Sequence, residues 1–194
     1  MKRLAILGST GSIGVNTLDI VRQFPERFEI VGLSAGLNIK LLKEQILQFR
    51  PKVVSLLSKE LSETLRRELS GMSSQIVHGI EGLIQVATHP EVDQVVSAIV
   101  GAVGLIPTLS AIKTGKPIAL ANKESLVMAG KIVMEEARQN RVQILPIDSE
   151  HSAIFQALLG HQKEDVRRLI LTASGGPFHN LPIGRLQEAT VRRP

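Results

Sequence analysis

Short apolar runs alternate with helical patterns from the start of the chain to about residue 147, and this alternation constrains the fold most strongly. Apolar runs separated by helices are typical of a parallel sheet whose two faces are both covered. Strands are expected at Leu4–Leu7, Phe28–Ser34, Val53–Leu57, Gln75–His78, Gln94–Val100, Pro117–Leu120 and Val142–Ile147. Helices are expected at Ile13–Phe24, Ile39–Phe49, Lys59–Leu69, Ile80–Ala87, Leu105–Lys113 and Ser125–Gln139. The pattern predicts a doubly wound α/β fold.

The alternation changes after residue 147. A helix is expected at Ser149–Leu159, then the charged stretch His161–Arg168, then a strand at Leu169–Thr172. We therefore predict one doubly wound domain over residues 1–147 and the beginning of an α+β domain over residues 148–194.

Charge and composition narrow the classes of partner. The 23 Lys and Arg against 18 Asp and Glu give a net charge of +5, which favours anionic ligands such as phosphates. Nucleic acid is not expected, because Tyr and Trp are absent and no basic run is long enough to follow a backbone. The sequence has no Cys, which excludes disulfides and thiolate chemistry and fits a reducing cytoplasm.

Two segments resemble a signal peptide or a membrane-spanning helix at first sight. Met1-Lys2-Arg3 could begin a signal peptide, but the apolar run that follows already ends at Gly8. The uncharged segment Val95–Ile112 approaches the length of a membrane span, but two Gly and one Pro divide it into a strand, a turn and a helix. No membrane partner is expected.

The run Gly8–Gly14 (GSTGSIG) follows the first strand and opens the first helix. Glycine lets backbone N–H groups approach a pyrophosphate, and a helix N-terminus attracts its charge. The spacing G-x-x-G-x-x-G differs from the commoner G-x-G-x-x-G, so a glycine-rich turn without a ligand is the alternative. The setting predicts a Rossmann-like dinucleotide site.

The segment Ser34–Lys40 follows the second strand, where such folds distinguish NAD from NADP. It contains no acid, which favours NADP. Asn38 either contacts the ligand or caps the next helix, and Lys40 either meets a phosphate or is a solvated helix residue.

Asn122, Lys123 and Glu124 follow the strand that ends at Leu120. Ligands gather beyond the carboxyl ends of parallel strands, so the three polar residues suit a site. The alternative is an ordinary helix start, with Asn122 as the cap.

Asp148 and Glu150 form the best candidate metal site. Two carboxylates separated by one residue at a strand end suit Mg²⁺ or Mn²⁺, with substrate oxygens, water or a further acid completing the shell. The alternative is helix capping by Asp148. A later segment, Thr172–Phe178, either wraps a phosphate with backbone donors or is a plain Gly-Pro turn.

Read in order, the segments are GSTGSIG, QVVSAIVGAVGLIPTL, ANKESLV, DSEHSAIFQ and TASGGPF. This combination resembles the 1-deoxy-D-xylulose 5-phosphate reductoisomerase family over essentially the whole chain. The resemblance implies rearrangement of 1-deoxy-D-xylulose 5-phosphate to a branched aldehyde phosphate. Hydride transfer from NADPH then gives 2-C-methyl-D-erythritol 4-phosphate, for the non-mevalonate isoprenoid pathway. It also implies a divalent metal, Mg²⁺ or Mn²⁺, and a homodimer for the full-length relatives.

The resemblance also implies roles for individual residues. The implied cofactor contacts are Thr10, Gly11, Ser12, Ile13, Gly36, Asn38, Asn122 and Glu124. The implied substrate contacts are Lys123, Ser149, Glu150 and Ser174. Lys123 and Glu150 would be catalytic, and Asp148 and Glu150 would bind the metal.

Two departures from the family affect this expectation. Leu37 stands where many relatives carry a basic residue beside the adenosine ribose, which bears on the preference for NADPH over NADH. Family members also continue with further phosphate and metal ligands, so the chain alone is expected to be inactive or very weak. A non-catalytic NADP-binding fragment and another NAD(P)-dependent dehydrogenase are the alternative interpretations.

Overall fold

The computed structural model describes the chain except for residues 169, 171–174, 177, 180, 189 and 191–194. The strands of the described part are β1 (Lys2–Leu7), β2 (Phe28–Ser34), β3 (Val53–Leu56), β4 (Gln75–His78), β5 (Gln94–Ser97), β6 (Ile118–Leu120) and β7 (Ile144–Pro146). Its α-helices are α1 (Ser12–Gln23), α2 (Ile39–Phe49), α3 (Lys59–Glu68), α4 (Gly79–Thr88), α5 (Leu105–Lys113), α6 (Lys123–Gln139) and α7 (Ser149–Leu158). Short 3₁₀ turns lie at Ala102–Gly104, Lys163–Asp165 and Ile183–Glu188.

All strand pairs are parallel, and the sheet order is β4-β3-β2-β1-β5-β6-β7. The order runs in one direction from β1 to β4 and in the other from β5 to β7. The sheet therefore has its topological switch point between β1 and β5, where ligands bind in open α/β sheets. The predicted Rossmann-like, doubly wound α/β fold is confirmed.

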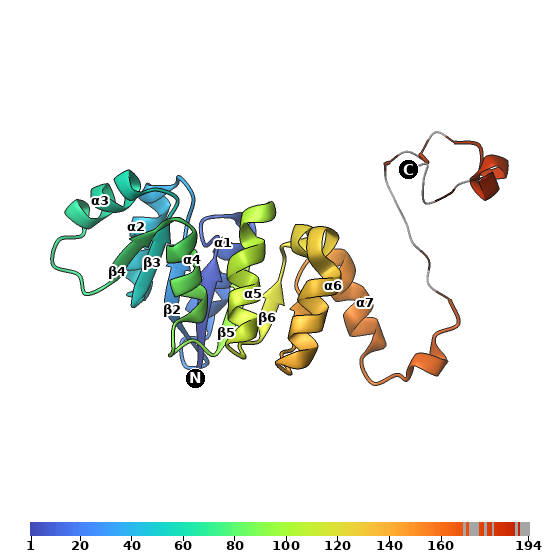
Figure 1. Ribbon diagram of the computed structural model, residues 1–194. Helices are drawn as coiled ribbons and strands as arrows, with labels where there is room; N and C mark the ends of the chain where they lie inside the picture. The colour runs from blue at the N-terminus through green and yellow to red at the C-terminus, as the bar shows by residue number, and fades with distance from the viewer. Residues whose placement is uncertain (169, 171–174, 177, 180, 189, 191–194) are drawn as a thin grey trace. The chain divides into compact units, whose positions relative to one another are not determined.

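Each face of the sheet has its own hydrophobic core. One core packs the sheet against α1, α2 and α3, through residues such as Leu18, Ile46 and Leu65. The other packs it against α4, α5 and α6, through residues such as Val86 and Ile112. In Figure 1, α4, α5 and α6 lie on the side of the sheet nearer the viewer. Burial on both faces explains why the strands read as continuous apolar runs.

Two element boundaries differ from the sequence expectation in ways that matter for the site. β5 ends at Ser97, three residues earlier than expected, and the chain then turns through Gly101, whose φ is +82°. α6 begins at Lys123, two residues earlier than expected, because the side chain of Asn122 accepts a hydrogen bond from the backbone N–H of Ser125. The residues between β5 and α5 form a loop that includes the 3₁₀ turn Ala102–Gly104, and not a longer strand.

The chain forms two compact units, Met1–Ala157 and Leu158–Pro194. α7 lies almost entirely in the first unit, so this unit extends past residue 147, and the predicted domain boundary stays a prediction. The expected strand at Leu169–Thr172 falls, except for Ile170, outside the described residues. In the part of the chain that the structure describes, no helix is long and apolar enough to cross a membrane.

Ser55 Oγ, on β3, is fully buried and has no hydrogen-bond partner among the described residues. We expect Ser55→Ala to stabilise the fold by about 1 kcal/mol, because it removes a desolvated hydroxyl that gains nothing in return. Ser62 Oγ is equally buried but donates to the Val77 carbonyl at 2.9 Å, so Ser62→Ala should destabilise by about 1 kcal/mol. Equilibrium urea unfolding measures both changes in stability. A loss of stability in Ser55→Ala would show that the Ser55 hydroxyl makes a stabilising interaction after all.

Candidate functional site

A glycine turn joins β1 to α1 at the switch point. Gly8 has φ +87°, and a Cβ there would lie 2.8 Å from the Ala98 carbonyl oxygen. A Cβ on Gly14 would lie 2.3 Å from the Gly8 carbonyl oxygen and 2.5 Å from Ser9 Cα. Side chains are therefore excluded at both ends of the turn, and the N-terminus of α1 is held close to the end of β1.

The N-terminus of α1 carries no internal cap. Gly11 is the N-cap residue, no side-chain hydrogen bond caps the helix start, and the first turn contains no acid. The first backbone N–H groups of a helix have no intrahelical acceptor, and the helix dipole adds partial positive charge there. This end of α1 can therefore bind an anion such as a phosphate.

Buried side chains hold the glycine turn in place. Ser34, at the end of β2, accepts from the Gly8 N–H with its Oγ at 3.0 Å and from the Ser9 N–H with its carbonyl at 2.8 Å. Gln45 projects from α2 and is 5% exposed. Its Oε1 accepts from Ser9 Oγ at 2.7 Å, and its Nε2 donates to the Ser9 carbonyl at 2.9 Å. The turn is thus fixed before any ligand arrives, which reduces the entropic cost of binding.

A cavity of about 450 Å³, here called the larger cavity, opens beside the glycine turn. It extends from the turn over the ends of β2, β3 and β5 to the beginning of α4. Its lining residues are Gly8, Gly11, Ser34, Ala35, Gly36, Leu56, Leu57, Gly79, Ile80, Leu83, Ala98, Ile99, Val100 and Val103. This largely apolar lining suits a flat ring system attached to a charged group.

A second cavity of about 140 Å³, the smaller cavity, lies between the start of α1 and the start of α6. Its lining residues are Gly11, Ser12, Ile13, Ala98, Ile99, Val100, Ala121, Asn122, Lys123 and Glu124. It shares Gly11 and the segment Ala98–Val100 with the larger cavity. The two cavities therefore adjoin, with the N-terminus of α1 at their meeting point.

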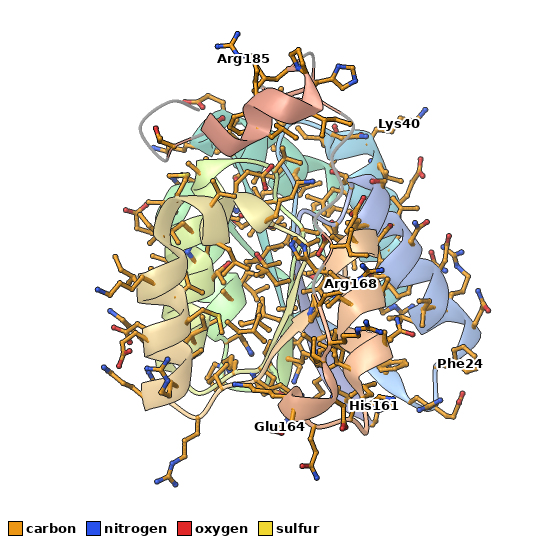
Figure 2. All side chains as sticks on the ribbon, turned by 90° about the vertical axis from the view of Figure 1, so that its right-hand side faces the viewer. Phe24, Lys40, His161, Glu164, Arg168 and Arg185 are labelled. Atoms are coloured by element: carbon orange, nitrogen blue, oxygen red, sulfur yellow. The ribbon has the colours of Figure 1, made fainter. Side chains whose placement is uncertain are left out.

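The segment after β2 is free of acids, as the sequence shows, and the side chains of Leu37, Asn38 and Lys40 are exposed. Asn38 caps α2, since its Oδ1 accepts from the Leu41 N–H at 3.1 Å. Lys40 extends outward from α2 (Figure 2), and Leu37 is 73% exposed. Gly36 lines the larger cavity, but Asn38 lines neither cavity.

The residues after β6 differ sharply in their surroundings. Asn122 is 2% exposed and bonded within the protein. Lys123 is exposed, and its ammonium group makes no ion pair or hydrogen bond with any described residue. Glu124 is half-buried. Lys123 is thus the cation of the smaller cavity that is free to meet an anionic ligand.

The acidic pair follows the neighbouring strand. β6 and β7 pair with Leu120 opposite Pro146, so Asn122 and Asp148 each lie two residues beyond paired positions at the same edge of the sheet. Asp148 Oδ2 lies 2.5 Å from Nδ1 of His151, while Ser149 and Glu150 are exposed. No group of three or more Asp, Glu, His or Cys residues that could hold a metal occurs among the described residues. Asp148 and Glu150 carry carboxylate oxygens of the kind Mg²⁺ prefers, and an ion bound by both would need further ligands from elsewhere.

The structure brings together some of the predicted site residues and not others. The predicted residues that line the two cavities are Gly11, Ser12, Ile13, Gly36, Asn122, Lys123 and Glu124. Those that line neither are Thr10, Asn38, Asp148, Ser149 and Glu150. Ser174 lies outside the described residues.

Sequence reasoning missed the side chains that support the site. Gln45 falls on the apolar stripe of its helix, three residues after Leu42 and one before Ile46, and a polar residue on such a stripe signals a buried hydrogen bond. The wall formed by Ala98–Val100 was hidden because these apolar residues extend the pattern of β5.

Sequence comparison places both parts of the chain in one family. The model of 1-deoxy-D-xylulose 5-phosphate reductoisomerase matches residues 4–130, and that of its C-terminal domain matches residues 144–193. The reductoisomerase of Geotalea uraniireducens is 56% identical and that of Geobacter metallireducens 57% identical, each over 191 residues, or 98% of this chain and 50% of the relative. The chain thus spans about half the length of the curated relatives it matches.

Solved structures agree with the sequence comparison. A DOX-P reductoisomerase in complex with NADPH, fosmidomycin and magnesium has a TM-score of 0.83 and 42% identity, covering 100% of this chain and 50% of that one. The enzyme from Zymomonas mobilis in complex with NADPH has a TM-score of 0.84 and 38% identity, covering 99% of this chain and 50% of that one. The chain belongs to the 1-deoxy-D-xylulose 5-phosphate reductoisomerase family.

Proposed function

We propose that this protein takes part in the NADPH-dependent, metal-dependent conversion of 1-deoxy-D-xylulose 5-phosphate to 2-C-methyl-D-erythritol 4-phosphate. Residues 1–147 would form the NADPH-binding domain, and residues from 148 onward would begin the catalytic domain. The observation that carries the proposal is the uncapped N-terminus of α1, which opens onto two adjoining cavities at the switch point of the sheet. Family membership supports 1-deoxy-D-xylulose 5-phosphate as the proposed substrate.

The two cavities suggest how the nucleotide is placed. The N–H groups of Ser12 and Ile13 would hold the pyrophosphate, with Thr10 and Gly11 beside it. In dinucleotide folds the adenosine ribose lies near the end of the second strand, so the adenosine would occupy the larger cavity beside Gly36. The nicotinamide would then point into the smaller cavity.

The residues after β6 and β7 would meet the substrate. Lys123 would attract the anionic substrate from the smaller cavity, Ser149 and Glu150 would contact its hydroxyl groups, and Ser174 belongs to the same proposed set. Asp148 and Glu150 would hold Mg²⁺ or Mn²⁺. When bound, that ion would polarise the carbonyl of the substrate and stabilise developing negative charge. In these proposed catalytic roles, Lys123 would position the anionic substrate beside the nicotinamide, and Glu150 would help to position the substrate and the charged metal ion there.

The proposal extends to location and assembly. A cytoplasmic location suits the cysteine-free sequence, and no nucleic-acid or membrane partner is proposed. A homodimer is proposed for the complete enzyme by likeness to the family.

Calorimetric titration with NADPH and, separately, NADH tests the cofactor assignment. We expect tighter binding of NADPH, because the segment Ser34–Lys40 contains no acid to repel a 2′-phosphate. A turnover assay with 1-deoxy-D-xylulose 5-phosphate and Mn²⁺ should accompany it, and any substrate-dependent oxidation of NADPH should require the metal. A folded sample that binds neither nucleotide would refute the assignment.

Leu37 offers a gain-of-affinity prediction. It follows Gly36 and is exposed, so an arginine there can reach a 2′-phosphate bound beside the larger cavity. We expect Leu37→Arg to tighten NADPH binding roughly tenfold and to leave NADH binding unchanged, because a charge-assisted contact to phosphate contributes about 1.5 kcal/mol. Leu47→Arg, at an exposed position of α2, is the matched control for added charge. Equal effects on both nucleotides would contradict the proposed placement of the adenosine.

A further inference from the structure

The side chain of Asn122 has all its hydrogen bonds inside the protein. Its Oδ1 accepts from both the backbone N–H and the hydroxyl of Ser125, and the N–H bond measures 2.8 Å. Its Nδ2 donates to the carbonyl oxygens of Ile99 and of Gly101, the latter at 2.8 Å. A primary amide has two donor hydrogens and an oxygen with two lone pairs. Asn122 can therefore contact a ligand with its amide only by giving up a bond it already makes.

The carbonyl groups that Asn122 holds belong to the wall between the two cavities. The loop Ala98–Val103 supplies Ala98, Ile99 and Val100 to both cavities and Val103 to the larger one. This loop exposes apolar surface, with Val100 85% exposed. An exposed loop of this kind needs an anchor to keep one conformation, and the Asn122 amide ties it to the first turn of α6.

Gly104 makes room for this anchor. A Cβ at residue 104 would lie 2.7 Å from Asn122 Nδ2 and 3.2 Å from its Cγ. The Gly104 carbonyl is held in turn by Thr108 Oγ1 at 2.6 Å, so the backbone cannot easily retreat from an added methyl group. The backbone of residue 122 is fixed as well, because the N–H groups of Ala121 and Asn122 both donate to the Ser97 carbonyl, at 3.0 and 3.1 Å.

We propose that Asn122 is a positioning residue for the nucleotide: its amide clamps the loop Ala98–Val103 to the start of α6 and so fixes the shared wall of the two cavities. In this role it acts through the loop and not by contact with the nucleotide. The inference rests on the proposed binding of NADPH, and it replaces a direct cofactor contact from this side chain.

The substitution Asn122→Asp removes the hydrogen bonds to the loop Ala98–Val103 while keeping the one that caps α6. Aspartate keeps an oxygen that can accept from Ser125, but it loses both donor hydrogens and places negative charge against two carbonyl oxygens. We expect the dissociation constant for NADPH to rise about tenfold or more, since two hydrogen bonds are lost. In the ligand-free protein, amide hydrogen exchange in residues 98–104 should accelerate while α6 stays protected.

Asn140→Asp is the matched control. Asn140 lies at the other end of α6, and its Nδ2 donates to the Glu136 carbonyl at 2.8 Å, so the same substitution removes a similar bond far from both cavities. NADPH affinity and exchange in residues 98–104 should not change. If Asn122→Asp does not fold, Asn122→Ser keeps an acceptor for the cap and replaces it in the same measurements.

A double-mutant cycle with Gly104 tests whether the two residues form one anchor, while hydrogen exchange in residues 98–104 distinguishes the clamp from direct contact. Gly104→Ala should displace the Asn122 amide and weaken NADPH binding about as much as Asn122→Ala does. The double variant should be little worse than either single variant, because both remove the same anchor. The proposal would be overturned if the effects of the two single variants on the NADPH dissociation constant multiply in the double variant. It would also be overturned if Asn122→Asp weakens NADPH binding without faster amide hydrogen exchange in residues 98–104. Absence of NADPH binding by the folded wild type would instead refute the proposed function, and the nucleotide-positioning role with it, even if exchange still showed the clamp.

Discussion

Gly14→Ala is expected to weaken NADPH binding at least about 100-fold, equivalent to roughly 2.7 kcal/mol. The new Cβ would overlap the backbone of Gly8 and Ser9, at 2.3 and 2.5 Å, and backbone atoms cannot move aside as a flexible side chain can. The turn must open, and the N–H groups at the start of α1 then lose their common direction. Overpacking of this kind costs about 1–3 kcal/mol, so a lower melting temperature should accompany the loss of binding. Calorimetric titration and thermal unfolding measure the two effects.

Gly130→Ala is the control for the same substitution. Gly130 lies within α6, and a Cβ there would meet only the Leu126 side chain at 3.9 Å, an ordinary contact. Gly130 follows a kink of α6 at Ala129 (φ −143°), and an added methyl group there meets no backbone atom from outside its own helix within 4 Å, so this variant should be about as stable as the wild type. Retention of NADPH affinity by Gly14→Ala would show that the glycine turn is not the pyrophosphate site.

Gln45→Met is expected to weaken NADPH binding about tenfold and to lower stability by roughly 1–3 kcal/mol. Methionine fills similar space, but it cannot donate to the Ser9 carbonyl or accept from the Ser9 hydroxyl. The buried carbonyl would lose its donor, and the glycine turn would lose its link to α2. Because Gln45 lines neither cavity, any loss of affinity must act through the turn.

Gln48→Met tests whether the effect is specific to that link. Gln48 lies on the exposed side of the same helix and accepts only a long bond from Arg22, at 3.4 Å. The Gln48→Met substitution should leave both the affinity for NADPH and the stability of the fold nearly unchanged. If Gln45→Met lowers the melting temperature but not the affinity for NADPH, Gln45 supports the fold alone and does not pre-organise the turn.

Much of the fold was predictable because its signals are local. Apolar runs located each strand of the part that the structure describes. The glycines of Gly8–Gly14 located the turn, because a side chain at Gly8 or Gly14 would overlap neighbouring backbone atoms. The end of β5 was not predictable, because Ala98, Ile99 and Val100 are as apolar as the strand before them. The Ala98 N–H still donates to the Leu7 carbonyl of β1, at 2.9 Å, and beyond it the Asn122 amide holds the carbonyl groups of Ile99 and Gly101 in the loop, a tertiary contact that no local pattern reveals.

The candidate site was predictable in part for the same reason. Residue types and strand ends pointed to Asn122, Lys123 and Glu124, and the structure places all three at the smaller cavity. The local pattern could not decide between a ligand contact and a helix cap for Asn122. That decision depends on residues about twenty positions earlier, which only the folded chain brings within reach.

A crystal structure of this chain with NADPH tests the central claim most directly. We expect the pyrophosphate at the N–H groups of Ser12 and Ile13, the adenosine in the larger cavity beside Gly36, and the nicotinamide in the smaller cavity near Lys123. The Asn122 amide should keep its bonds to Ile99 and Gly101. Nucleotide bound elsewhere on the sheet, or bound in the reverse direction, would contradict the proposed site.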